Sequence, residues 1–162
     1  MTVSAPSTVS SIPDVERIAR FRDRPAVWLS YGGAAVLGAY RERLEPLGLR
    51  PSWVTALAIV EEKEGITQSG LARELRINRA SAMAISQRMD EEGLVLREAL
   101  PGRNRTGLTL TAKGEERLAQ ACAIERCMVE EWMGDIGEED FEAFLRVLKT
   151  MVARAACSQP RD

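Results

Sequence analysis

Two stretches of the sequence carry basic side chains and no acidic residue. Residues 76–88 contain three arginines, and residues 99–113 contain two arginines and a lysine. Guanidinium and ammonium groups bind phosphate oxygens, and an arginine also pairs with the O6 and N7 atoms of guanine. Residues 115–142 instead contain ten acidic residues and two arginines. A local basic region on an acidic chain is typical of DNA binding, because salt screens attraction beyond about 8–10 Å. The alternative is that these runs are solvated faces.

The composition argues against catalysis and metal binding. The chain has no histidine, which removes the most common general base and metal ligand. The three cysteines (Cys122, Cys127 and Cys157) are too few and wrongly spaced for a structural zinc site. We therefore predict no catalytic residue, no metal and no cofactor. We expect Cys122 and Cys127 to be buried structural thiols, with redox sensing as the alternative.

Two short helices and a hairpin are predicted around the basic region. Thr67 is expected to cap a helix over residues 68–75, and Asn78 a second helix over residues 79–92, which Gly93 ends. Strands are expected at residues 94–98 and 108–110, joined by a Pro-Gly turn. This order predicts a winged helix-turn-helix, whose second helix enters the major groove of DNA.

Apolar residues recur at helical spacing on both sides of this module. Residues 26–47 and 53–63 precede it, Thr111 is expected to cap a long helix after it, and a final helix begins at Glu138. These helices have little to bury against within one small module, so we expect them to pair with a second copy. The predicted fold class is mainly α with a small β-hairpin wing (α+β), flanked by N- and C-terminal dimerisation helices.

We predict five segments along the chain: a flexible tail at residues 1–13, N-terminal dimerisation helices at 14–50, the winged module at 51–112, C-terminal dimerisation helices at 113–157 and a tail at 158–162. The N-terminal run MTVSAPSTVSSIP has no basic start and no long apolar stretch, so we do not expect a signal peptide. Glycines interrupt the apolar residues after Pro25, which argues against a membrane span. We therefore expect a soluble protein with no membrane partner. An odd cysteine count without an export signal indicates a reducing, cytoplasmic setting.

From Leu44 to about Ala155 the chain resembles the MarR family of bacterial transcriptional regulators. The matching segments are LEPLGLRPSWVTALAIV, ITQSGLARELRI, QRMDEEGLVLR, LTLTAKGEERL and GEEDFEAFLRVLKTM. The resemblance implies a homodimer that binds a pseudo-palindromic operator in double-stranded DNA, most often a repressor released by a small, often aromatic, effector. Two features depart from the family: the wing turn PGRNR lacks the usual aspartate, and Met83-Ala84 replaces a common Ser-Arg pair.

The predicted DNA contacts lie on the module's second helix, on the face away from Ile85 and Met89. These residues are Arg79, Ser81, Ala84, Gln87 and Arg88. Arg79 and Ser81 are expected in the groove, and Gln87 and Arg88 at or near the backbone. The alternative for Arg88 is a stabilising pair with Asp90, Glu92 or a wing residue.

Further contacts are predicted from the neighbouring elements. Thr67 and Gln68 either donate to phosphate or only cap their helix. In the wing, Arg103, Asn104 and Arg105 are expected to reach DNA, since a Pro-Gly turn places them at an exposed tip.

The resemblance also implies an effector pocket where the dimerisation helices meet the winged module. The residues predicted to line it are Trp28, Tyr31, Tyr40, Arg43 and Trp53, with Arg43 binding a carboxylate. The alternative is that these aromatic residues pack in the core and the dimer. The alternative function is a winged-helix dimer that acts through protein or ligand contacts and binds DNA weakly or not at all.

Overall fold

The computed structural model describes residues 23–99 and 106–157 of the 162-residue chain. The chain forms two compact units, Met1–Ala39 and Tyr40–Asp162. No helix in the described ranges is both long enough and apolar enough to cross a membrane. The tails predicted at residues 1–13 and 158–162 lie outside these ranges.

The described part of the first unit is mainly the N-terminal portion of helix α1 (Pro25–Leu44). The carbonyl of Arg24 accepts hydrogen bonds from the backbone N–H groups of Val27 and Trp28, at 3.1 and 3.3 Å. Proline suits this start because the N–H group that it lacks would have no partner in the first turn. The side chains of residues 29–37 are exposed.

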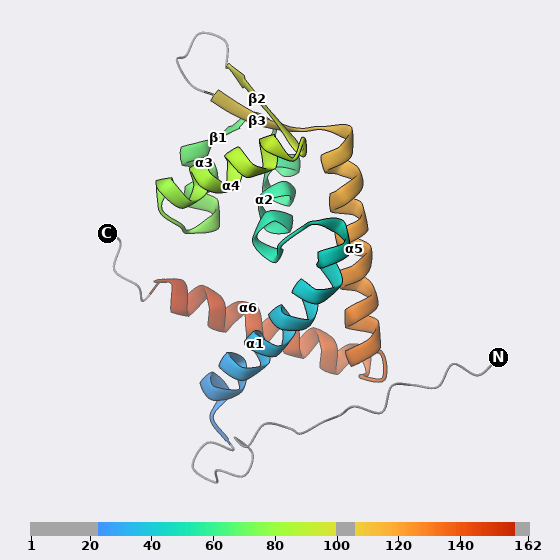
Figure 1. The fold of residues 1–162 in the computed structure, drawn as a ribbon. Coiled ribbons are helices and arrows are strands. Elements are labelled where there is room, and N and C mark those ends of the chain that lie inside the picture. The colour runs from blue at the N-terminus through green and yellow to red at the C-terminus, as the bar shows by residue number, and fades with distance from the viewer. Residues whose placement is uncertain (1–22, 100–105, 158–162) are drawn as a thin grey trace, which may run out of the picture. The chain divides into compact units, whose positions relative to one another are not determined.

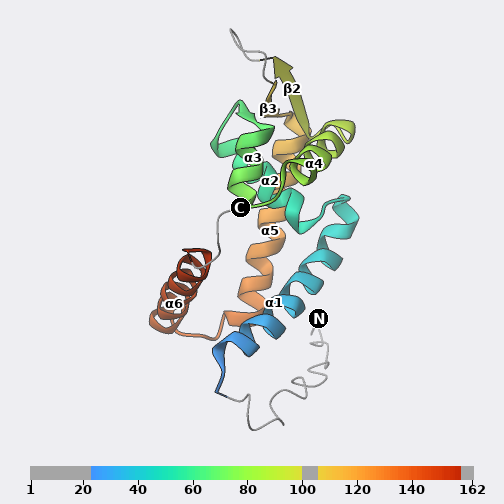
Figure 2. The same cartoon turned by 90° about the vertical axis from the view of Figure 1, so that its left-hand side faces the viewer.

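The second unit contains the winged helix-turn-helix that the sequence predicted (Figure 1). After α1 its elements are η2 (Glu45–Leu47), α2 (Pro51–Glu62), β1 (Ile66–Thr67), α3 (Gln68–Leu75), α4 (Arg79–Glu91), β2 (Val95–Ala99), β3 (Thr106–Leu110), α5 (Ala112–Met133) and α6 (Glu138–Cys157). The predicted helix pair corresponds to α3 and α4, and the predicted hairpin to β2 and β3. Figure 2 shows the hairpin projecting from the end of the unit where α3 and α4 lie.

Side-chain caps begin the three helices around the module. Thr67 Oγ1 accepts from the backbone N–H of Gly70 at 3.1 Å, and Asn78 Oδ1 accepts from Ser81 at 2.8 Å. Thr111 Oγ1 accepts from the N–H of Gly114 at 3.0 Å, at the start of α5. Each bond satisfies an N–H group that has no partner within its helix. All three predicted caps are confirmed.

The sheet has three antiparallel strands in the order β1-β3-β2. Ile66 pairs with Leu108, and Val95 pairs with Leu110. The sequence predicted only the two strands of the hairpin. The third strand, β1, has two residues, which is too short to produce an alternating pattern. It forms because the chain before α3 lies beside β3.

The core of the second unit gathers around α2. Leu57 of α2, Leu71 of α3, Met89 of α4 and Leu108 of β3 are all fully buried, together with Leu44 at the end of α1. Each such side chain contributes about 1.5–3 kcal/mol to the stability through burial. These contacts fix the two short helices of the module against the sheet.

The prediction that Cys122 and Cys127 are buried thiols is wrong, since both are exposed in the chain. The buried face of α5 includes Leu118, Ala121 and Met128. Each cysteine is one residue away from a buried position, which turns its side chain by about 100° around the helix. The prediction assigned both positions to the core without fixing which face of α5 is buried.

Candidate nucleic-acid interface

The exposed face of α4 carries the residues predicted to contact DNA. Arg79, Ser81, Ala84, Gln87 and Arg88 are all exposed. The opposite face buries Ala82, Ser86 and Met89 against the rest of the unit. At about 100° per residue, Ser81, Ala84, Gln87 and Arg88 fall within about 120° around the helix, and Arg79, the first residue of α4, lies outside this arc. This exposure is a requirement for contact with DNA, and the contacts themselves stay predictions.

The guanidinium of Arg79, the first residue of α4, is held by α3. Its Nε and Nη2 atoms donate to Ser69 Oγ, at 3.1 and 2.7 Å. An arginine has five N–H donors, so three remain available to another acceptor. The sequence analysis did not include Ser69, because ten residues separate the two partners and only the turn between the helices brings them together.

A hollow of about 260 Å³ lies beside this pair. Its lining combines the start of α3, the start of α4 and the first residue of β3: Thr67, Gln68, Ser69, Arg79 and Thr106. The side chain of Thr67 is already used as the cap of α3. Thr67 therefore caps α3, and its contact with phosphate stays a prediction.

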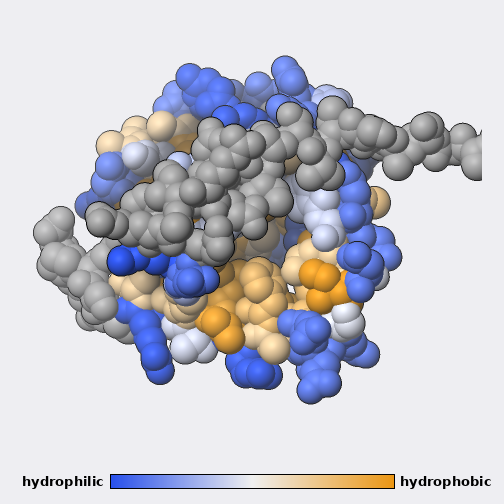
Figure 3. Space-filling view, turned by 90° about the horizontal axis from the view of Figure 1, so that it is seen from below, coloured by the Kyte–Doolittle hydropathy of each residue, from blue (hydrophilic) through white to orange (hydrophobic). Residues whose placement is uncertain are grey.

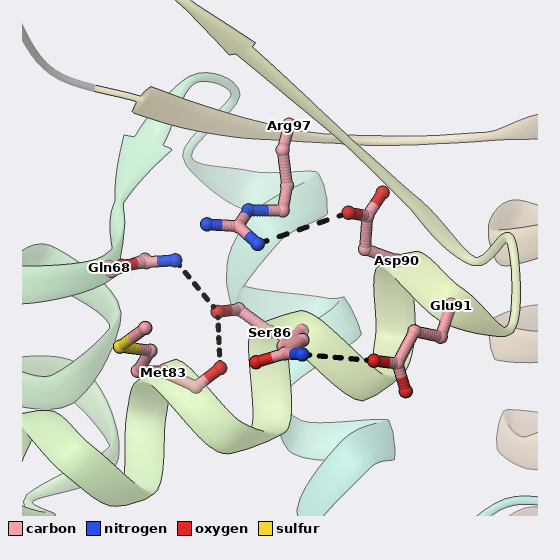
Figure 4. A network of polar contacts seen from close by, with 7 residues as sticks. Gln68, Met83, Ser86, Asp90, Glu91 and Arg97 are labelled. Atoms are coloured by element: carbon pink, nitrogen blue, oxygen red, sulfur yellow. Dashed lines mark hydrogen bonds and ion pairs between the residues drawn. The ribbon is translucent and has the colours of Figure 1, made fainter.

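A buried serine joins the two helices (Figure 4). Gln68 Nε2 donates to Ser86 Oγ at 3.2 Å, and Ser86 Oγ donates to the carbonyl of Met83 at 3.0 Å. Ser86 is fully buried. One N–H donor of Gln68, which was predicted to contact phosphate, is therefore used to hold α3 against α4.

Replacing Ser86 with alanine is expected to lower the free energy of unfolding by about 1–2 kcal/mol, because Gln68 Nε2 loses its acceptor. Urea denaturation followed by circular dichroism measures the change. Ser81→Ala is the matched control, since it makes the same chemical change on the exposed face of α4. Equal stability of the two variants would contradict a structural role for the Gln68–Ser86 bond.

The end of α4 has further polar contacts. Asp90 Oδ2 lies 4.0 Å from Arg97 Nη1 of β2, and Gln87 Nε2 donates to Glu91 Oε1 at 3.0 Å (Figure 4). Of the alternatives predicted for Arg88, an ion pair with Asp90 or Glu92 is not found among the described residues, and the wing residues 100–105 lie outside them. Arg88 is exposed on α4.

The predicted wing contacts Arg103, Asn104 and Arg105 lie outside the described residues. The described strands fix where the wing is anchored, since Ala99 of β2 pairs with Thr106 of β3. Both strands belong to the sheet that also contains β1. Contact of these three residues with DNA stays a prediction.

The residues predicted for an effector pocket divide between the two units: Trp28 and Tyr31 belong to the first, and Tyr40, Arg43 and Trp53 to the second. Trp53 is buried in the hydrophobic core, with 8% of its surface exposed. Tyr40 donates to the carbonyl of Ala121 at 3.5 Å. Burial raises the pKa of the Tyr40 hydroxyl, and the nearby Cys122 and Glu125 raise it further.

Arg43 already has a carboxylate partner in this chain. Its Nη2 atom lies 2.6 Å from Glu131 Oε2, and its guanidinium carbon lies 5.6 Å from the ring centre of Trp132. Glu131 accepts one of the five N–H donors of Arg43, and a ligand carboxylate would share the guanidinium with it. The sequence did not indicate this pair, because 88 residues separate its partners.

The similarity of this chain to known proteins agrees with the geometry. A sequence model of the MarR family matches residues 47–105. The transcriptional regulator HosA of Escherichia coli O111:H- is 33% identical over 104 residues, which cover 64% of this chain and 76% of HosA. The chain belongs to the MarR family of transcriptional regulators. As a member of that family it is a regulator of transcription and not an enzyme.

Solved structures of MarR family proteins have the same fold. A complex of MepR from Staphylococcus aureus with DNA aligns with a TM-score of 0.70 and 16% identity, over 81% of this chain and 96% of MepR. A Mycobacterium tuberculosis MarR family protein in complex with salicylic acid aligns with a TM-score of 0.61 and 25% identity, over 80% of this chain and 97% of that protein. The predicted family and fold class are therefore confirmed.

Proposed function

We propose that this MarR family member is a dimeric, sequence-specific DNA-binding repressor that a small aromatic ligand releases from its operator. The observation that carries the proposal is a pair of exposed arginines on α4: Arg79 at its first residue, bonded to Ser69, and Arg88 further along the helix. Arginine is the side chain best suited to bind guanine and phosphate. A related fold, MepR, is known in complex with DNA. DNA as the ligand also implies a cytoplasmic location.

The dimer is supported by apolar side chains that the chain leaves uncovered. Phe144, Val147 and Val152 of α6 are 46%, 55% and 59% exposed. Seen from below, apolar surface lies among hydrophilic residues (Figure 3). A second copy would cover such a surface. A two-fold dimer would place two α4 helices in successive major grooves, about 34 Å apart, on a pseudo-palindromic operator.

The proposed effector acts by binding one state of the dimer more tightly than the other. A ligand shifts an equilibrium only by its difference in affinity for the two states. An aromatic carboxylate is the proposed class, because a MarR family protein with a related structure binds salicylic acid. In this chain the carboxylate would bind the guanidinium of Arg43, one donor of which Glu131 already uses.

Fluorescence anisotropy tests DNA binding. The purified protein is titrated into labelled DNA from upstream of its own gene, and into a shuffled duplex of the same composition, at a series of salt concentrations. We expect tighter binding to the upstream DNA and a steep loss of affinity as salt rises, because bound arginines release counterions from phosphate. Weak binding without preference would contradict the proposal.

One observation favours a second function, in which the winged-helix dimer binds a protein or ligand and not DNA. Met83 lies on the exposed side of α4 with 52% of its surface exposed, next to the exposed Ala84. Apolar side chains at this position offer no hydrogen bond to DNA. The same titration separates the two functions, since only DNA binding has a steep dependence on salt.

A further inference from the structure

We propose that Ser69 is a positioning residue for DNA recognition: it orients the guanidinium of Arg79 so that one edge of that group is presented to a base pair. The proposal rests on the proposed function, because it requires Arg79 to contact DNA. The inference adds to the proposed function the residue that sets the geometry of the contact between Arg79 and DNA.

The two hydrogen bonds of Ser69 occupy one edge of the guanidinium. Nε and Nη2 lie along the side of the planar group, and both donate to Ser69 Oγ. The hydroxyl oxygen has two lone pairs and accepts both. The end edge, formed by Nη1 and the second N–H of Nη2, keeps parallel donors. Two parallel donors are what guanine O6 and N7 accept.

Fixing this side chain before DNA binds affects recognition through entropy. A free arginine loses about 2 kcal/mol of rotamer freedom when it is ordered. Arg79 and Ser69 are both exposed, so packing does not restrict the guanidinium. The two bonds to Ser69 supply this restraint in the absence of DNA, and a preorganised group loses less freedom on binding.

Ser69 is itself held in place relative to α4. The preceding residue, Gln68, donates to the buried Ser86 of α4 at 3.2 Å, and Thr67 caps the same turn of α3. The hydroxyl of Ser69 therefore belongs to a segment that α4 anchors. The hollow of about 260 Å³, which Ser69 and Arg79 both line, leaves space beside the guanidinium.

The test measures base discrimination, which a merely structural role would not change. A preferred duplex is first selected from a random library with the wild-type protein. The Kd is then measured for that duplex and for each of its single-base-pair substitutions. The variants are Ser69→Ala, Ser69→Thr, Arg79→Ala and the double variant Ser69→Ala/Arg79→Ala. Circular dichroism checks that each variant is folded.

We expect Arg79→Ala to lose about 10- to 100-fold of discrimination at one base-pair position. Ser69→Ala should lose roughly three- to tenfold at the same position, as expected for one or two hydrogen bonds. Ser69→Thr retains the hydroxyl and should retain discrimination. In the Arg79→Ala background, Ser69→Ala should have no further effect, because its partner is absent.

Ser52→Ala is the matched control. Ser52 is an exposed serine at the second position of α2, as Ser69 is at the second position of α3. We expect no change in discrimination for this variant.

Two results would overturn the inference about Ser69 alone. In the first, Ser69→Ala weakens all duplexes equally, which would make Ser69 a phosphate contact. In the second, its effect persists without Arg79. If the wild-type protein itself prefers no sequence, the proposed function fails and the role of Ser69 fails with it.

Discussion

Replacing Gly114 with alanine is expected to lower the free energy of unfolding by about 3 kcal/mol, the upper part of the range for overpacking. A Cβ atom at this position would lie 2.0 Å from the carbonyl oxygen of Leu94 and 3.0 Å from its carbonyl carbon. Both are backbone atoms, so no rotamer change relieves the contact. The same carbonyl accepts a hydrogen bond from the backbone N–H of Thr111 at 3.1 Å. This bond would be disturbed if the start of α5 moved away from Leu94 to make room for the Cβ atom.

The expected destabilisation by Gly114→Ala is opposite in sign to the usual effect of this exchange. Within a helix, exchanging glycine for alanine ordinarily stabilises by about 1 kcal/mol. Here the steric term has the opposite sign and exceeds this gain. Urea denaturation measures the result, and Gly137→Ala is the control, because a Cβ at Gly137 meets nothing within 4 Å. We expect a change of less than about 0.5 kcal/mol for the control. Stabilisation by Gly114→Ala would contradict the close packing of α5 on Leu94.

This close approach matters because it joins α5 to the end of α4. Thr111 Oγ1 donates to the carbonyl of Gly93 at 2.7 Å, and Lys113 Nζ donates to the carbonyl of Glu92 at 2.6 Å. With the packing of Gly114, these bonds tie the first turn of α5 to the turn that follows α4. The start of α5 is therefore anchored to the turn that follows α4, the helix proposed to read DNA.

The features that the sequence predicted correctly depend on local chemistry. The caps Thr67, Asn78 and Thr111 each bond to a backbone N–H three residues later. Such a bond needs no information from elsewhere in the chain. The helix pair and the hairpin follow from the same local patterns, since apolar periodicity and turn residues are properties of short segments.

The features that the sequence did not predict depend on contacts between distant residues. The strand β1 forms only because Ile66 lies beside Leu108. Arg43 was predicted to bind a ligand carboxylate, and the structure pairs it with Glu131. The sequence identified Arg79 as an exposed donor. It did not identify Ser69 as its partner, because that contact requires the angle between α3 and α4.

Substituting aspartate for both Phe144 and Val152 is expected to convert a dimer to a monomer. These side chains are 46% and 59% exposed in the chain. They are eight residues apart, with the partly buried Leu148 midway between them, and thus share one face of α6. Burying a Phe side chain contributes about 1.5–3 kcal/mol, and an unpaired carboxylate in an apolar interface opposes association. Two-fold symmetry places four such carboxylates in one interface.

Loss of the dimer should also weaken specific DNA binding by about 100-fold or more, because linked half-sites gain 10²–10⁴ in affinity. Sedimentation analysis measures the mass, with 17.9 kDa expected for the monomer and twice this value for the dimer. Anisotropy measures the affinity for DNA. The control is Arg146→Asp/Thr150→Asp, which adds aspartates to the opposite, exposed face of α6. If the Phe144/Val152 variant remains dimeric, α6 is not the interface, and the apolar face of α6 must serve a different partner.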